Sequence, residues 1–479
     1  MTQNKTLLSN SNHLDKKSGF NFSYLLALAL TSAMGGLLFG YDWVVIGGAK
    51  PFYELYFDIK DSPSLQGWAM SSALIGCVFG ALLSGTFSDR YGRKIPLIIA
   101  AFLFILSAFG SGQAESFQWF VFYRIVGGVG IGLASTLSPL YIAEIAPAAY
   151  RGRFVSINQL TIVIGILAAQ IINYFIAESV PEQIGEEELS NSWNALVGWR
   201  WMFWAELIPA SLFFGLMFLV PKSPRFLIKI GKDLEALKIL SKIGGENYAQ
   251  IEVSQIKSTM SGSVQKVQFS ELTAPKVKPI IILGVVLAIF QQWCGINVIF
   301  NYADEIFTSA GYSVGEMLFN IIITGSVNLV FTLLAMRLVD QWGRKKMMKF
   351  GALGLAIIYF VLGLSYFMGW TGLPILLLVI SAIAVYAFSL APVTWVVLSE
   401  IFPNRIRGLA MAISTLALWI ASFVLTFTFP ILNNALKASG TFWVYCGISI
   451  LGYLYIKFNL KETKGKSLEE IEKELNNPV

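Results

Sequence analysis

Two short charged phrases occur twice in this chain, once in each half, and each copy stands between long apolar runs. Asp-Arg-Tyr-Gly-Arg-Lys at 89–94 returns as Asp-Gln-Trp-Gly-Arg-Lys at 340–345. Glu-Ile-Ala-Pro at 144–147 returns as Glu-Ile-Phe-Pro at 400–403, and an Arg-Gly pair follows each copy. A duplicated charged loop inside an apolar chain predicts two homologous membrane bundles that face each other.

The apolar runs have the length that a membrane crossing needs. The chain of 479 residues is 55% hydrophobic and 13% charged, whereas soluble proteins contain about 25% charged residues. A spanning helix needs roughly 20 mainly apolar residues. By that measure the sequence predicts about twelve spans, near 24–48, 66–87, 95–113, 117–142, 154–178, 201–220, 279–307, 315–338, 347–368, 373–398, 408–432 and 437–458. We therefore expect an all-α integral membrane protein built from two pseudo-symmetric six-helix bundles.

The predicted organisation has four parts. They are an N-terminal bundle over 1–221, a cytoplasmic linker with helices over 222–278, a C-terminal bundle over 279–460 and a cytoplasmic tail over 461–479. An amphipathic pattern in the linker predicts a helix on the cytoplasmic face, formed by Leu234, Leu237, Ile239, Leu240 and Ile243. The linker is shorter than a soluble enzyme domain.

The charges predict the orientation in the membrane. Lys and Arg are concentrated in six segments, whereas the loops at 51–64, 180–192 and 303–317 carry mostly Asp and Glu. The positive-inside rule then places both termini in the cytoplasm. The pI near 9.0 is also typical of nucleic-acid binding, but the charge pattern favours a topology signal. We expect a multi-pass cell-membrane protein, in a bacterial inner membrane, that acts as a monomer.

Small residues in the spans predict close packing rather than chemistry. Cys77, Cys294 and Cys446 lie in apolar runs without the spacing of metal ligands or disulfides. Gly128 and Gly132 form a small-xxx-small face for helix packing, because their spacing does not fit a nucleotide loop.

Three ionisable residues fall inside predicted spans. Asp42 lies in the first span, Arg124 in the fourth and Glu206 in the sixth. Such residues are usually paired or functional, because a lone charge at mid-membrane costs about 2.5–3.5 kcal/mol. Asp42 and Arg124 form either a static ion pair or a switchable proton site, with Glu206 as a second candidate. The one histidine, His13, lies in the polar N-terminal stretch, so a carboxylate must carry any transported proton.

Five further phrases occur in a fixed order along the chain. They are Phe-Gly-Tyr-Asp at 39–42, Pro-Leu-Tyr-Ile-Ala-Glu at 139–144, Pro-Lys-Ser-Pro-Arg at 221–225, Gln-Gln-Trp-Cys-Gly-Ile-Asn at 291–297 and Glu-Thr-Lys-Gly at 462–465. With the duplicated loops, they make the chain resemble the sugar porter family of the major facilitator superfamily. The resemblance implies sugar transport by alternating access, with no cofactor. Proton-coupled bacterial members resemble this chain in having Asp at the position of Asp42, which would make the proton the coupling ion, whereas uniporters commonly have a neutral residue there.

Amides inside the spans are the predicted sugar ligands. A planar amide pairs with adjacent hydroxyls, and an aromatic face covers the C–H surface of a sugar. The candidates in the spans are Gln159, Gln291, Gln292, Asn297 and Asn328, with Trp395 as a stacking surface. The resemblance implies that these positions bind sugar and that Phe39 contacts it. The alternative for each amide is a hydrogen bond to a neighbouring helix, and for Trp395 plain packing.

Several positions depart from the family pattern. Ile166 and Leu418 stand where polar amides are typical, Asn301 replaces a usual Tyr, and Ala391 replaces a usual Gly. Asn301 adds room and one amide to the predicted pocket, so the sugar need be neither xylose nor glucose. Lys222 and Lys461 stand in place of a usual Glu and Pro, which affects local ion pairing at the cytoplasmic ends.

The duplicated loops are predicted to form a cytoplasmic ion-pair latch. It would close the inner face in the outward-open state, with the alternative that these residues serve only topology and helix capping. The first half supplies Asp89, Arg93, Glu144 and Arg151, and the second supplies Asp340, Arg344, Glu400 and Arg407.

The function that these observations favour is import of a monosaccharide, pentose or hexose, together with a proton. The alternatives are a facilitative uniporter of the same sugars and a proton-coupled polyol or inositol transporter. A sugar sensor would need a long cytoplasmic tail. An enzyme is least favoured, because the sequence shows neither a nucleophile–base pair nor a metal cluster.

Overall fold

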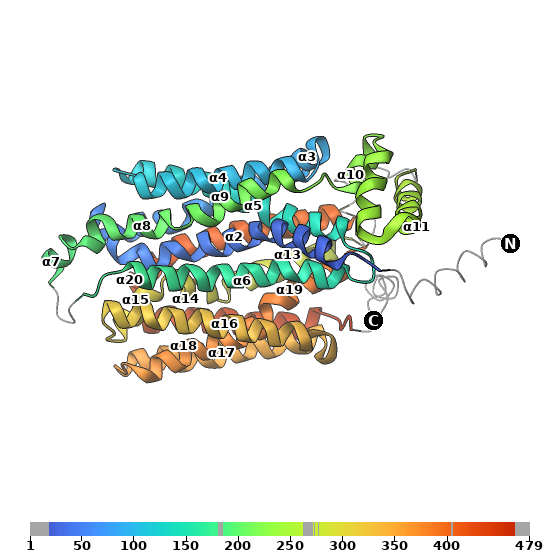
Figure 1. Ribbon diagram of the computed structural model, residues 1–479. Helices are drawn as coiled ribbons and strands as arrows, with labels where there is room; N and C mark the ends of the chain where they lie inside the picture. Colours follow the sequence, from blue (N-terminus) through green and yellow to red (C-terminus); the bar gives the residue numbers. More distant parts are fainter. Residues whose placement is uncertain are drawn as a thin grey trace.

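The computed structural model describes residues 19–180, 185–261, 272, 274–275, 277–403 and 406–464. Within these ranges the secondary structure is helical, and the long helices run roughly along one common axis (Figure 1). Helix α7 (Glu186–Ser190) marks one end of the bundle, which we call the α7 end. Helices α10 (Pro224–Lys229) and α11 (Asp233–Ser261) mark the other, the α11 end.

The helices divide into two sets that follow the sequence repeat. The first half contains α2 (Phe22–Tyr56), α3 (Pro63–Tyr91), α4 (Lys94–Gln113), α5 (Phe117–Ile145), α6 (Arg151–Ile176), η1 (Asn194–Gly198), α8 (Trp199–Trp204) and α9 (Leu207–Leu219). The second contains α13 (Lys278–Trp293), α14 (Ile296–Asn301), α15 (Ala303–Ser309), α16 (Val314–Trp342), α17 (Arg344–Phe367), α18 (Leu373–Phe388), α19 (Leu390–Ile401) and α20 (Arg407–Asn459). Across the interface α3 packs on α20, and α6 packs on α16.

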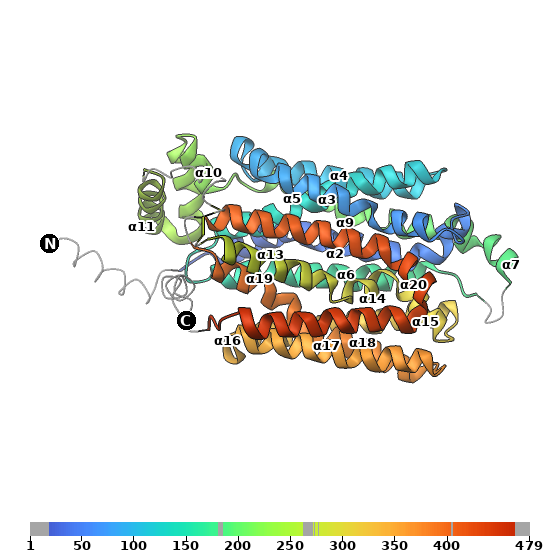
Figure 2. The ribbon, with the colours of Figure 1, turned by 180° about the vertical axis from the view of Figure 1, so that it is seen from behind.

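The number of membrane crossings agrees with the sequence. Eleven helical segments of the described residues are long and apolar enough to span a membrane, and the last of them, α20, has 53 residues. A helix of that length measures about 80 Å, whereas the hydrocarbon core is about 30 Å thick. Lys437 breaks α20 with a φ of 60° and a ψ of 173°, and Figure 2 shows the chain reversing there. The two parts of α20 are the predicted spans 408–432 and 437–458, which makes twelve.

Three crossings are broken near their middle rather than continuous. The sixth bends at Ala205 and Glu206, between α8 and α9. The seventh, predicted as one run over 279–307, breaks at Gly295, whose φ of +87° favours glycine. The tenth breaks at Ser389, between α18 and α19. Broken helices leave backbone groups unpaired at membrane depth, which is where transporters build their binding sites.

Helices α3 and α5 pack with their backbones in contact. A Cβ atom on Gly128 would overlap the carbonyl oxygen of Ala73, and one on Gly132 would overlap that of Cys77. The predicted small-residue packing face is therefore confirmed. The three cysteines are free and buried, as expected.

The linker forms a small core of its own at the α11 end. Its buried residues are Leu227, Ile228, Ala236, Leu240, Ala249 and Val253. The predicted amphipathic face is wrong at Leu234, which is 77% exposed. Helix α11 packs on α10 through the face of Ala236 and Leu240, and Leu234 lies about 200° around the helix from Ala236. The Asn21 N–H donates to the Ile243 carbonyl oxygen at 2.8 Å, so the linker docks on the start of α2.

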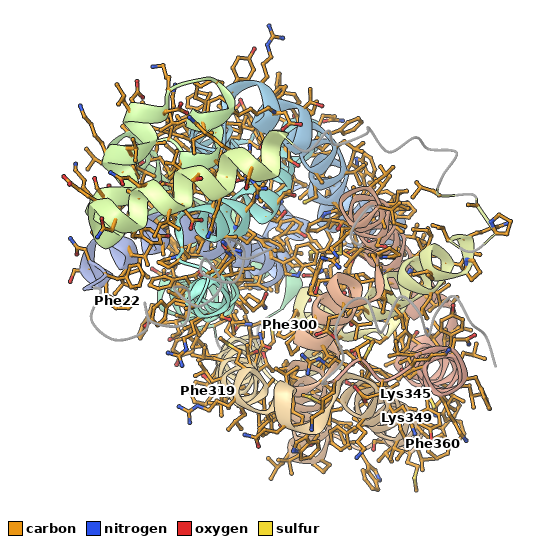
Figure 3. All side chains as sticks on the ribbon, turned by 90° about the vertical axis from the view of Figure 1, so that its right-hand side faces the viewer. Phe22, Phe300, Phe319, Lys345, Lys349 and Phe360 are labelled. Carbon is orange, nitrogen blue, oxygen red and sulfur yellow. The ribbon has the colours of Figure 1, made fainter. Side chains whose placement is uncertain are left out.

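Figure 3 looks along the bundle from the α11 end. Helix α11 covers the first half there, whereas Lys345 and Lys349 of α17 lie on the side of the second half. Helix α11 therefore does not extend over the second half in this view.

Candidate substrate and coupling site

A buried ion pair joins two helices of the first half. The Arg124 guanidinium on α5 donates one hydrogen bond to Oδ1 of Asp42 on α2 and a second, at 3.3 Å, to the Asp42 carbonyl oxygen. Asp42 is 1% exposed and Arg124 is 2% exposed. The guanidinium also lies 5.8 Å from the Phe203 ring centroid. Two opposite charges that the sequence places 82 residues apart are thus brought together, as expected for a paired intramembrane charge.

A second carboxylate shares this site. Glu206 lies at the break of the sixth crossing, is 1% exposed and interacts electrostatically with both Asp42 and Arg124. Within the described residues, Asp42 Oδ2 and Glu206 Oε1 are buried without a hydrogen-bond donor. Two carboxylates therefore face one guanidinium, so the site has room for a proton as counter-charge.

The amides of the seventh crossing form a hydrogen-bonded row. Gln291 Nε2 donates to the hydroxyl oxygen of Tyr386 on α18 at 2.8 Å, and Gln292 Nε2 donates to Gln291 Oε1 at 2.6 Å. Asn297 Nδ2 in turn donates to Gln292 Oε1. The break at Gly295 separates Gln292 from Asn297 and lets the two amides meet, although they are five positions apart. We call Tyr386, Gln291, Gln292 and Asn297 the amide row.

Three aromatic side chains connect the two halves. The rings of Phe39 and Trp43 on α2 lie 6.0 Å apart, and Trp419 on α20 lies 5.9 Å from Phe39 and 6.2 Å from Trp43. Trp419 is buried, and its Nε1 is among the buried donors that lack a hydrogen-bond partner in the described part of the chain. An aromatic face beside a free N–H is chemistry that suits a sugar. Phe39 was predicted from the sequence, whereas Trp43, Trp419 and Tyr386 were missed.

The other predicted sugar ligands lie on four helices, α14, α16, α6 and α19. Asn301 on α14 and Asn328 on α16 are buried, and Asn301 Oδ1 lacks a donor among the described residues. Gln159 on α6 is half-buried. Trp395 on α19 is 36% exposed and lies outside the aromatic group of Phe39, Trp43 and Trp419.

The positions that lack the family's amides are filled by apolar side chains. Ile166 and Leu418 are both buried. Gln170, one helical turn beyond Ile166 on α6, is also buried, and a Cβ atom on Gly325 of α16 would overlap its Oε1. Gln170 was missed by the sequence reasoning, and it places an amide at the interface between the halves.

The duplicated loops make the same ion pair in each half. Arg93 Nη2 lies 2.7 Å from Glu144 Oε1, and Arg344 Nη2 lies 2.9 Å from Glu400 Oε1. A hydroxyl also bonds each glutamate, because Ser223 donates to Glu144 and Thr463 donates to Glu400. The repeat of the sequence is therefore a repeat of geometry, and these pairs hold helices within one half.

The remaining latch candidates lie at the same end of the bundle. Asp89 pairs with Lys229 of α10 at 3.1 Å, and Arg407 donates to the Phe402 carbonyl oxygen at 3.1 Å. Arg151 is exposed at the first residue of α6. The side chain of Asp340 lies outside the described part of the structure. An ion-pair latch between the halves stays a prediction for the outward-open state.

One asymmetry distinguishes the two halves at this end. Glu462 accepts the backbone N–H groups of Arg344 and Lys345 at 2.8 and 3.2 Å, which caps the start of α17. The matching position beside Ser223 is Lys222, whose ammonium repels that of Lys94 at the start of α4. The start of α4 therefore carries an unfavourable charge where α17 has a favourable one.

We expect Lys222→Glu to stabilise the protein by about 1 kcal/mol, because a carboxylate at a helix start is favourable. The melting midpoint in detergent should rise by roughly 1–2 °C for a chain of this size. Lys222→Gln removes the repulsion of Lys94 without adding a carboxylate at the start of α4, so it measures the repulsion alone. Lys242→Glu, on the exposed face of α11, makes the same change of charge away from α4. An equal midpoint for Lys222→Glu and Lys242→Glu would contradict the capping account.

Comparison with known proteins decides the family. The model of the family described as "Sugar (and other) transporter" matches residues 28–475. The chain belongs to this sugar transporter family. It is accordingly a multi-pass membrane transporter and not an enzyme.

Individual relatives agree over nearly the whole length. The D-xylose-proton symporter of Escherichia coli (strain K12) is 42% identical over 483 residues, covering 95% of this chain and 96% of the relative. The glucose facilitated diffusion protein of Zymomonas mobilis is 36% identical, covering 93% and 96%. The inward open conformation of the xylose transporter XylE from E. coli superimposes with a TM-score of 0.82 at 40% identity, covering 94% of this chain and 99% of that one. The fold is thus that of a sugar transporter of the major facilitator superfamily.

Proposed function

We propose that this protein imports a monosaccharide together with a proton by alternating access. The observation that carries the proposal is the buried pair of Asp42 and Arg124 with Glu206 beside it, since two carboxylates around one guanidinium provide a proton site. A symport relative, the D-xylose-proton symporter, supports the same reading.

The sugar site in this proposal lies between the halves. The amide row of the second half offers several donors and acceptors to adjacent hydroxyls. The aromatic group of Phe39, Trp43 and Trp419 would cover an apolar face of the sugar. Because Phe39 and Trp43 flank Asp42 on α2, a bound sugar and a bound proton would act on the same helix. That shared helix couples the two binding events.

The proposed orientation places the α11 end in the cytoplasm. The basic loops and the linker gather at this end, whereas the acidic segments before α3 and after α14 lie at the α7 end. Similarity to an inward open structure supports a conformation in which the outer side is closed. Both termini would be cytoplasmic, in a cell membrane of bacterial type.

We expect the charge reversal Glu400→Lys to favour the inward-open state, because it removes a carboxylate from the latch that is predicted to close the inner face in the outward-open state. The measurement is the rate at which a thiol reagent modifies a cysteine placed at Ser156 of α6, the helix that packs on α16. The rate should rise severalfold relative to the parent. Glu246→Lys, on the exposed surface of α11, is the matched control, and equal rates in the two variants would count against the latch.

A facilitative uniporter is the second candidate function. It is favoured by the glucose facilitated diffusion relative and by the alternative that Asp42 and Arg124 form a fixed ion pair. A proton-coupled transporter of a polyol or inositol remains a third, because Ile166 and Leu418 remove amides and Asn301 adds one.

The experiment that tests the proposal uses purified protein in liposomes. Uptake of a panel of pentoses, hexoses and polyols is measured with and without an inwardly directed proton gradient. We expect one class of sugar to accumulate above the external concentration only with the gradient. Equilibration to the external concentration under both conditions would establish the uniporter instead.

A further inference from the structure

A buried charge cluster joins the halves at the α7 end of the bundle. The ammonium Nζ of Lys50 on α2 lies 2.9 Å from Asp304 Oδ2 and 2.8 Å from Glu305 Oε1 of α15. It also lies 3.3 Å from Oε1 of Glu54, one turn further along α2. Lys50 is 1% exposed, Glu54 5% and Asp304 6%. We call these four residues the Lys50 cluster.

The Lys50 cluster bridges the two halves of the protein. Lys50 and Glu54 belong to the first half, whereas Asp304 and Glu305 belong to the second. Neutral amides extend it on both sides: Gln66 of α3 donates to Glu54 Oε2 at 3.2 Å, and Asn433 of α20 donates to Glu305 Oε2 at 2.9 Å. Helix α15 and the end of α2 lie opposite α11 (Figure 1), so the cluster joins the halves at the end of the bundle opposite α11.

The charges of the cluster do not balance. Three carboxylates face one ammonium, which leaves two negative charges if all three are ionised. The other titratable groups near it are the phenols of Tyr53 and Tyr302, whose neutral rings supply no positive charge, and the Tyr302 ring centroid lies 5.5 Å from Lys50 Nζ. Arg124 of α5 already pairs with Asp42.

Two carboxylate oxygens of the cluster show where a proton fits. Asp304 Oδ1 and Glu54 Oε1 are buried and without a hydrogen-bond partner among the described residues, and of the two only Glu54 Oε1 has an ion-pair contact with Lys50 among them. An ionised carboxylate whose oxygen is left bare in a buried site is costly, and protonation of one carboxyl group removes both the bare charge and part of the repulsion.

We propose that the Lys50 cluster is a proton-binding gate that closes the outer face of the transporter. The ion pairs of Lys50 hold the halves together there, and the closed cluster keeps a proton that is released when the halves separate. The proposal rests on the alternating access of the proposed function, and it is independent of the role of Asp42.

The direction of the pH dependence follows from proton counting. In the outward-open state the carboxylates are exposed to water and are ionised at neutral pH. In the closed state one of them is protonated, so closure binds a proton. Falling external pH therefore favours closure and rising pH favours opening, with a change in the closed-to-open ratio of up to about tenfold per pH unit.

The test measures the distance between the halves at this end in the full chain. Spin labels are placed at Ser64 of α3 and Thr308 of α15, both exposed, after the buried cysteines are replaced by alanine. Double electron–electron resonance is recorded in lipid nanodiscs from pH 5 to pH 9. The parent should show a short distance at low pH and a growing long-distance population as the pH rises.

Variants separate the bridge from the proton. Lys50→Met should show the long distance at every pH, whereas Lys50→Arg keeps the charge and should retain the short one. Glu54→Gln removes one negative charge and should keep the short distance across the pH range.

Each result bears on one part of the proposal. A short distance that persists in Lys50→Met would overturn the gate, and a parent distribution that does not respond to pH would overturn the linked proton. The series is repeated with Asp42→Asn, where the pH response should persist. In the parent protein, absence of proton-driven uptake with a retained pH response would mean that the proposed function fails and the gate stands. Proton-driven uptake without a pH response of the distance would mean that the gate fails and the proposed function stands.

Discussion

Asp42→Asn is expected to abolish sugar accumulation driven by a pH gradient while leaving sugar exchange intact. The substitution keeps the size of the side chain and a hydrogen bond to Arg124 but removes the group that can take up a proton. One proton moving down 100 mV releases about 2.3 kcal/mol, which corresponds to accumulation of several tens of fold. We expect the ratio of internal to external sugar to fall from this range to about one.

The measurement compares two assays on the same liposomes. Counterflow, in which unlabelled sugar inside exchanges for labelled sugar outside, needs no net proton movement and should continue at a similar rate. Glu206→Gln is the matched control, because it neutralises the second carboxylate beside Arg124. It should reduce accumulation less than Asp42→Asn does. Accumulation that is undiminished in Asp42→Asn would refute the assignment of the coupling site.

Gln292→Ala is expected to cause the largest loss of sugar affinity among single substitutions. Gln292 is the centre of the amide row, because it donates to Gln291 and accepts from Asn297. Its removal takes away ligand atoms and also breaks two hydrogen bonds, the one that Gln291 Oε1 accepts and the one that Asn297 Nδ2 donates. Each lost hydrogen bond in a buried site costs about 1–3 kcal/mol, so the KM for uptake should rise roughly 10- to 100-fold.

The change in KM must be separated from a change in folding. Asn459→Ala is the control, since that amide bonds the Tyr455 carbonyl oxygen of its own helix at the end of α20. The melting midpoint of Gln292→Ala should stay within a few degrees of the parent. An unchanged KM would favour the alternative that the row only joins neighbouring helices.

The helical plan could be predicted from the sequence because it follows from the membrane itself. A run of about 20 apolar residues has few alternatives to a spanning helix, so the positions of the crossings agree with the structure. The equivalence of Arg93–Glu144 and Arg344–Glu400 could likewise be anticipated from the repeated phrases. Because both residues of the pair are repeated in the sequence, the same ion pair can form in each half.

The contents of the interface could not be predicted, because they depend on contacts between distant segments. Lys50 lies at the edge of an apolar run, where the sequence predicts the start of a loop. Its partners Asp304 and Glu305 on α15 are 254 and 255 positions away. Trp419 is one aromatic among many in the spans, and nothing local to it indicates Phe39 or Trp43 as neighbours. Likewise, nothing in the sequence around Tyr386 indicates that its hydroxyl accepts a hydrogen bond from Gln291.

The break in the seventh crossing brings together two amides that the helical pattern of the sequence places on different faces. Asn297 is five positions after Gln292, and on a straight helix their side chains point in different directions. Gly295 interrupts the helix between them, and the amides then meet in one row. A glycine in an apolar run is common, so its effect on the site becomes visible only once the backbone is seen.

Proton-coupled transport is tested most directly by the pH inside sealed liposomes when sugar is added to the outside without any pre-formed gradient. Symport predicts that the interior acidifies at a rate that follows sugar entry, and that Asp42→Asn liposomes stay at constant pH while exchange continues. Entry of sugar into parent liposomes with no change of internal pH would contradict it.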